Sequence, residues 1–156
     1  MSALPSQSRY IIGTEACERF SFYGMKSILM LYMTGHLLMS DNWATSTLHI
    51  FVGMVYLLPL AGAWLADKVW GRYKTILYIS LLYCVGHGVL ATADLFHTIE
   101  ARRYILMAGL FIIALGAGGI KPCVSAFMGD QIPNKSPQLM TKAFNAFYWA
   151  INLGSF

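Results

Sequence analysis

The first apolar stretch of the sequence carries four charged residues of a kind that membrane helices ordinarily exclude: Glu15, Glu18, Arg19 and Lys26. At 100° per residue, positions 15, 18, 19, 22, 23 and 26 fall on one face of a helix. Such charges are costly at the bilayer centre unless they are paired or face water. An isolated Glu15–Arg19 pair is one explanation. The length of the stripe, with Tyr23 below it, favours the wall of a hydrophilic pathway.

Lys121 is a second charge inside an apolar stretch, and it lies between Gly119 and Pro122. Small side chains let helices approach closely, and a proline leaves one backbone carbonyl without its partner. The Lys121 ammonium needs an anion nearby. Glu15 and Glu18 are the only acidic candidates inside the expected spans, so we predict an interhelical ion pair with one of them. Snorkelling of Lys121 to the membrane interface is the alternative.

Two further groups of polar residues share helix faces. His49 and Tyr56 are seven residues apart, and histidine changes its charge near neutral pH. His49 is therefore either proton-responsive or a neutral ring bonded to a backbone carbonyl. Tyr148, Asn152 and Ser155 share a face of the last apolar stretch, where an amide serves helix packing or binds a polar solute.

The composition indicates that these residues lie in a membrane protein. Of 156 residues, 57% are hydrophobic and 12% charged, and the mean hydropathy is +0.56. These values exclude a soluble enzyme and a small secreted scaffold. The net charge of +4 comes from scattered Lys and Arg, which favours contact with anionic lipid over nucleic acid. No nucleophile–base pair or metal-ligand spacing appears, so we expect no enzyme activity, metal or cofactor.

The hydropathy pattern predicts an all-α membrane protein with about five transmembrane helices. We expect the fourth helix to be broken by the small-residue run 116–119 and by Pro122. The last helix is still apolar at Phe156, after only about 15 of the roughly 20 residues that a span requires, so we expect a fragment of a longer protein. The expected helices cover about residues 10–39, 45–66, 75–93, 104–128 and 141–156.

The basic residues outside these spans predict the orientation. The N-terminus and the segments 67–74 and 129–142 carry six Lys and Arg, whereas the other side carries only Arg102 and Arg103. Because cytoplasmic loops are enriched in Lys and Arg, we expect a cytoplasmic N-terminus. The segment 67–74 alternates acid and base around a glycine, which is typical of a solvated turn.

Four stretches, in chain order, resemble the motifs of the proton-dependent oligopeptide transporters, a branch of the major facilitator superfamily. Residues 15–20 read E-A-C-E-R-F, similar to the family's E-x-x-E-R-F. Two tyrosines usually follow this motif, but position 22 is Phe here, so only Tyr23 supplies a hydroxyl. Residues 62–74 resemble the superfamily's cytoplasmic loop between helices two and three. Residues 118–131 and 147–155 resemble the fourth-helix and fifth-helix signatures.

The resemblance implies the N-terminal part of a protein with two six-helix bundles, which carries di- and tripeptides with protons across the cell membrane by alternating access. By this resemblance, Arg19 and Lys121 would clamp the peptide carboxylate and Asn152 would bind near its amino end or an amide. Tyr23 and Tyr56 would hydrogen-bond the peptide. The C-terminal bundle is not part of the chain.

The same resemblance implies roles in proton coupling and gating. Glu15 and Glu18 would alternate between protonation and pairing with Arg19 or Lys121. The region around His49 is similar to members, animal ones included, that carry a histidine on the second helix, although many bacterial members lack it. Asp67 and Arg72 would belong to a gating loop.

Two other interpretations remain open. The chain is alternatively a truncated N-terminal bundle without transport activity of its own. Relatives in the same family also carry nitrate or other small anions, although the pairing of Glu15 and Glu18 with Arg19 favours proton-coupled peptide transport.

Overall fold

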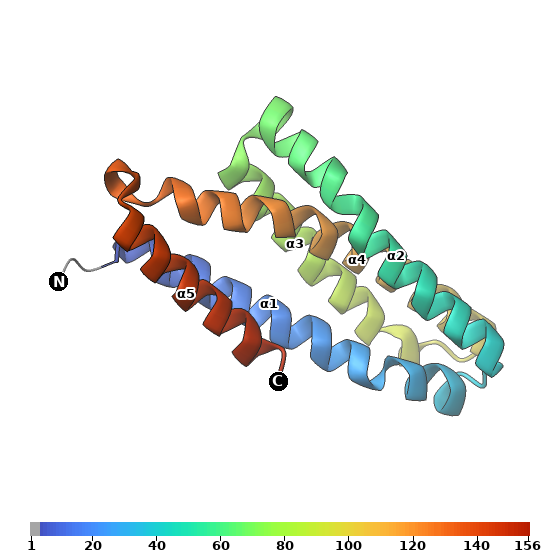
Figure 1. Cartoon of the computed structure of the whole chain (residues 1–156). Coiled ribbons are helices and arrows are strands. Elements are labelled where there is room, and N and C mark those ends of the chain that lie inside the picture. Colours follow the sequence, from blue (N-terminus) through green and yellow to red (C-terminus); the bar gives the residue numbers. More distant parts are fainter. Residues whose placement is uncertain (1–3) are drawn as a thin grey trace. The chain divides into compact units, whose positions relative to one another are not determined.

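A computed structural model describes residues 4–156, except for the side chain of Lys135. The described residues form five α-helices joined by short π-helical and 3-10 turns (Figure 1). The α-helices are α1 (Ser6–Leu31), α2 (Asp41–Leu65), α3 (Arg72–Ala91), α4 (Ile99–Asp130) and α5 (Pro137–Gly154). The turns are η1 (Tyr32–His36), η2 (Ala66–Trp70), η3 (Ala93–Leu95) and η4 (Pro133–Lys135).

The predicted all-helical membrane architecture is confirmed. Within the described part of the chain, three helical segments are long and apolar enough to cross a membrane by length and composition: Asp41–Trp70, Arg72–Leu95 and Ile99–Asp130. The first helix is also long, but the charged residues of its polar stripe lower its hydropathy. These charged residues therefore distinguish α1 from an ordinary lipid-facing helix.

The segment 67–74 is helical on both sides of Gly71 and not the short loop that we predicted, although most of its residues are exposed. The helix continues from α2 through the π-helical turn η2, and only Gly71 interrupts it before α3 begins. Gly71 has a φ of 77° and a ψ of 158°, a conformation that residues with a Cβ rarely adopt. The alternating charges of this segment thus lie on helical turns on either side of one glycine.

The predicted break in the fourth helix is also wrong. The helix α4 runs without interruption from Ile99 to Asp130 and includes Pro122. A proline removes one helical hydrogen bond, but transmembrane helices tolerate it where neighbouring helices and local adjustments compensate. The run of glycines before it provides close packing instead of a break.

The chain divides into two compact units. The first unit contains residues 4–27 and 124–156 among those described. In it, α5 runs beside the N-terminal part of α1 (Figure 1). Its core contains Met128, Ile132 and Ala143, against which Ile11 and Leu139 pack. This core fixes the start of α1 and thereby the polar stripe that follows it.

The second unit contains residues 28–123. Its helices approach closely at glycines of α4, as the small-residue run predicted. A Cβ added at Gly62 of α2 would lie 2.6 Å from the carbonyl oxygen of Gly119, and one at Gly116 would lie 2.6 Å from Cβ of Tyr83 on α3. Real Cβ atoms essentially never come so close, so α2 and α3 reach the α4 backbone only because these residues are glycines.

Candidate functional site

Three charged side chains of the polar stripe form one buried cluster in the first unit. The guanidinium of Arg19 pairs through Nε with Glu15 at 3.0 Å and through a terminal nitrogen with Glu18. All three residues are at most 7% exposed. The local Glu15–Arg19 pair that we considered is therefore present, but a second carboxylate joins it. One guanidinium thus faces two carboxylates, and this group carries a net negative charge when both are ionised.

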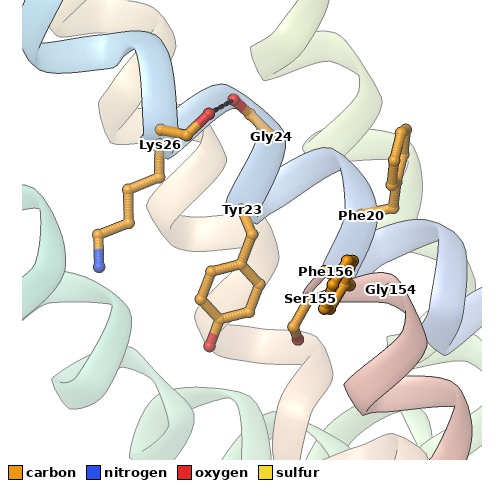
Figure 2. Close-up of a pocket in the computed structure, with 8 residues that line it drawn as sticks. Phe20, Tyr23, Gly24, Lys26, Gly154, Ser155 and Phe156 are labelled. Atoms are coloured by element: carbon orange, nitrogen blue, oxygen red, sulfur yellow. Dashed lines mark hydrogen bonds between the residues drawn. The ribbon is translucent and has the colours of Figure 1, made fainter.

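A cavity of about 380 Å³ in the same unit lies beside the C-terminal part of this stripe. Its polar lining includes Tyr23 and Lys26 of α1 and Ser155 after α5. Figure 2 shows the ring of Tyr23 and the long side chain of Lys26 extending on the same side of α1. The neighbouring Phe22 is buried and contacts the Tyr23 ring edge-on at 5.5 Å between ring centroids. The Phe22 ring thereby supports Tyr23 at the wall of the cavity.

Gly154 sets the spacing between α1 and α5. A Cβ added there would collide with the carbonyl oxygen of Ala16 and would lie 2.9 Å from Cβ of Arg19. The backbone of α5 therefore packs directly against the turn of α1 that carries the ion pairs. This contact helps to enclose Arg19, which is only 6% exposed.

Asn152 is not among the residues that line this cavity. Its side-chain nitrogen donates a hydrogen bond of 2.9 Å to the carbonyl oxygen of Tyr148, one turn earlier in α5. The residue is exposed, so its amide oxygen is accessible for another partner. The predicted role of Asn152 in peptide binding stays a prediction.

Lys121 and Tyr56 come together in the second unit. The Lys121 Nζ atom lies over the ring of Tyr56, at 5.3 Å from the ring centroid. Tyr56 is 74% exposed, so its hydroxyl can reach a further ligand. A cation over an aromatic face is attracted by the ring quadrupole, and this contact orients the ammonium. Two residues that the family resemblance assigns to peptide binding are thus neighbours.

The predicted pair between Lys121 and Glu15 or Glu18 stays a prediction. Lys121 belongs to the second unit, whereas both glutamates belong to the first. His49 on α2 is exposed, as is Tyr56 two turns later. This exposure fits the shared face that their spacing predicted, and the role of His49 is still open.

Asp67 and Arg72 flank the interruption at Gly71. Asp67 lies in η2 and is exposed, whereas Arg72 is the first residue of α3 and is half-buried. Thr75 stabilises this junction, since its hydroxyl donates a hydrogen bond of 2.9 Å to the carbonyl oxygen of Gly71. The predicted gating role of Asp67 and Arg72 is not tested by this geometry.

Sequence reasoning missed one polar cluster in the second unit. Tyr32 and His36 of η1 both contact the carboxylate of Asp94 in η3. The sequence offers only a weak signal for this contact, because 58 residues separate His36 from Asp94. Among the described residues, no group of three His, Cys, Asp or Glu side chains is arranged to hold a metal ion.

Comparisons with known proteins bear on the chemistry of these clusters. The model of the POT family matches residues 73–156. Peptide transporter family 1 of Drosophila melanogaster is 47% identical over 153 residues, which make up 97% of this chain and 20% of the relative. The chain thus spans about a fifth of the length of the curated relatives that it matches.

Solved structures are similar in both sequence and fold. The crystal structure of the POT family transporter PepTSo is 48% identical with a TM-score of 0.88, and the match covers 99% of this chain and 31% of that one. A crystal structure of a proton dependent oligopeptide (POT) family transporter is also 48% identical, with a TM-score of 0.81, and the match covers 94% of this chain and 32% of that one.

Proposed function

Because the chain belongs to the POT family, we propose that it forms the N-terminal part of a transporter that carries di- and tripeptides together with protons across the cell membrane. The Drosophila relative is named a peptide transporter, and a similar structure is that of a proton dependent oligopeptide transporter. These names support the substrate class and the coupled ion. Alternating access requires a second bundle, which we infer to lie in the rest of the full-length protein.

The buried cluster of Glu15, Glu18 and Arg19 is the observation that carries this proposal. Two carboxylates share one guanidinium in a setting with little access to water. Burial disfavours the charged form of a carboxylate, and a second carboxylate nearby disfavours it further, whereas Arg19 favours it. Such opposed effects suit a group that takes up and releases a proton during a transport cycle.

Protonation of one glutamate changes what Arg19 can bind. A neutral carboxyl no longer forms an ion pair, so the guanidinium becomes available to another carboxylate. The C-terminal carboxylate of a peptide fits this role, since Arg–carboxylate bonds are charge-assisted and often bidentate. Peptide and proton are thereby linked, because the peptide carboxylate replaces the carboxylate that the proton has neutralised.

The proposed peptide site also contains Lys121, Tyr56 and Tyr23. Lys121 supplies a second cation for the peptide carboxylate, oriented by the ring of Tyr56. Tyr23 lines the cavity of the first unit and, like Tyr56, offers a hydroxyl for a peptide hydrogen bond. Asn152 binds near the amino end of the peptide or an amide. We also propose that Glu15 or Glu18 pairs with Lys121 in one conformation.

The remaining assignments concern gating and location. We propose that Asp67 and Arg72 act at the junction around Gly71, where two helical segments meet and a change in backbone angles is easily accommodated. The excess of Lys and Arg around the N-terminus and the second-to-third helix junction supports a cytoplasmic N-terminus in the cell membrane.

Uptake by the full-length protein in proteoliposomes tests this proposal. We expect a labelled dipeptide to accumulate above its external concentration when the outside is acidic, and a protonophore to abolish this accumulation. Unlabelled tripeptide is expected to compete, whereas nitrate is expected not to.

Two outcomes would contradict the proposal. Dipeptide accumulation that is the same with and without a proton gradient would exclude proton coupling. Uptake of nitrate without uptake of peptide would assign the charged cluster to a different substrate.

A further inference from the structure

Three side chains from two segments of the second unit, η1 and α4, approach the carboxylate of Asp94 in η3. The hydroxyl of Tyr32 donates a hydrogen bond to Asp94 Oδ1 at 2.9 Å, and His36 Nε2 lies 3.0 Å from the same oxygen. Arg102, near the start of α4, approaches this oxygen to 3.9 Å. The ring of His36 is stacked on that of Tyr32, at 5.2 Å between ring centroids. This stacking fixes the imidazole edge that faces Asp94.

A second set of contacts holds the backbone directly after His36. Arg103 of α4 donates hydrogen bonds to the carbonyl oxygens of Leu37, at 2.8 and 3.0 Å, and of Leu38, at 2.7 Å. Leu38 has a φ of 50°, in the left-handed region that residues with a Cβ rarely adopt. Such a conformation persists only where its surroundings hold it. Arginine stays charged at all ordinary pH values, so this contact is independent of pH.

His36 is the histidine that contacts Asp94 in this cluster, and histidine is the side-chain type that can switch between neutral and charged forms near neutral pH. A neutral imidazole with its proton on Nε2 donates an ordinary hydrogen bond to Asp94. A protonated imidazole donates a charge-assisted bond, which is stronger. The facing Arg102 carries a positive charge that opposes this gain, and Tyr32 contributes a hydroxyl hydrogen bond to the same carboxylate.

We propose that His36 and Asp94 form a proton-responsive tether, which holds the end of the first membrane helix more tightly against the turn between α3 and α4 when His36 is protonated. The added stability is present when the imidazole is protonated, at acidic pH, and is lost in the neutral form. Both side chains are about half exposed, so the gain is modest and decreases with salt. The tether does not depend on the proposed transport of peptides.

Hydrogen exchange in the full-length protein measures this tether directly. The exchange rates of residues 32–40 are compared between wild type and His36→Gln at pH 5.5 and again at pH 8.0. Comparison at one pH cancels the intrinsic pH dependence of amide exchange. Glutamine keeps a hydrogen-bonding side chain but does not titrate. We expect this segment to exchange about two- to fivefold faster in His36→Gln at pH 5.5 and at the wild-type rate at pH 8.0.

Two further variants make the test specific. His97→Gln removes an exposed histidine from the same turn as Asp94 and is expected to exchange like wild type at both pH values. Asp94→Asn removes the charged partner, so adding His36→Gln to it should cause no further acceleration at pH 5.5. The proposal is overturned if His36→Gln changes exchange equally at both pH values or at neither. Because only hydrogen exchange is read, failure of peptide transport would leave this result unaffected.

Discussion

The side chains of Glu15, Glu18 and Arg19 show how a sequence alone can predict chemistry at the level of single residues. Their spacing places them on one helix face, and the cost of charge in a membrane predicts that they are paired or face water, of which the sequence favoured the wall of a hydrophilic pathway. The structure pairs both glutamates with Arg19. Neighbours on one helix are predictable in this way because helix geometry fixes their separation.

Contacts between distant residues were less accessible to sequence reasoning. The family resemblance assigned Lys121 and Tyr56 to the same ligand, but their direct contact is visible only in the structure. The contact of His36 with Asp94 was not anticipated at all. Neither contact follows from periodicity, because each joins side chains on different helical segments.

The first prediction at the level of single residues concerns His49. We expect His49→Gln to flatten the pH profile of dipeptide uptake by the full-length protein, because His49 is exposed on α2, histidine as a side-chain type can take up a proton near neutral pH, and glutamine cannot. The measurement is initial uptake between pH 5.5 and 8. His97→Gln serves as the control, since His97 is also exposed but lies outside the proposed site.

A structural role for His49 predicts a different result. If His49→Gln retains the shape and midpoint of the wild-type profile, the imidazole does not respond to protons during transport. Peptide binding measured in the same variant separates a change in coupling from a general loss of folding.

At the scale of helices, the sequence predicted the number and type of elements better than their interruptions. Five α-helices are present among the described residues, as the hydropathy pattern indicated. The expected loop at 67–74 is helical except at Gly71, and α4 continues through the expected break at Pro122. Local rules treat charge, glycine and proline as signals for ending a helix, but neighbouring helices can compensate for a lost hydrogen bond.

The prediction at the level of helices concerns Gly154, because this residue lets α5 approach the turn of α1 that contains Arg19. Gly154→Ala should lower the free energy of unfolding by about 1–3 kcal/mol, the usual cost of an added group in a packed interface. Thermal unfolding of the full-length protein in detergent measures the change. Gly13→Ala on α1 is the matched control, since a Cβ there meets no heavy atom within 4 Å. Equal melting temperatures for the two variants would show that the close approach at Gly154 is not required.

At the scale of the whole molecule, the distribution of Lys and Arg predicts the orientation in the membrane, which helix periodicity alone does not predict. Six Lys and Arg on one side of the expected spans and two on the other predict the orientation in the membrane. An ion pair between side chains of different units cannot be predicted in the same way, since helix periodicity does not determine which helix faces meet. The proposed pair of Lys121 with Glu15 or Glu18 therefore stays a prediction.

Antibody labelling of intact cells tests the orientation. We expect a tag at the N-terminus to be labelled only after the cells are permeabilised, because the N-terminus is proposed to be cytoplasmic. A tag inserted in the turn at residues 96–98 should be labelled without permeabilisation. The reverse pattern would invert the topology and place the His36–Asp94 tether on the cytoplasmic side.

The central claim is that the intramembrane charges couple peptide movement to protons, and Lys121→Ala tests it most directly. Uphill dipeptide accumulation and exchange without a gradient are measured on the same proteoliposomes, with Glu18→Gln as a second variant at the proposed proton site. We predict that accumulation is abolished in both variants while exchange is retained to a greater extent, because the conformational change no longer depends on the proton. Undiminished uphill accumulation in either variant would contradict the account.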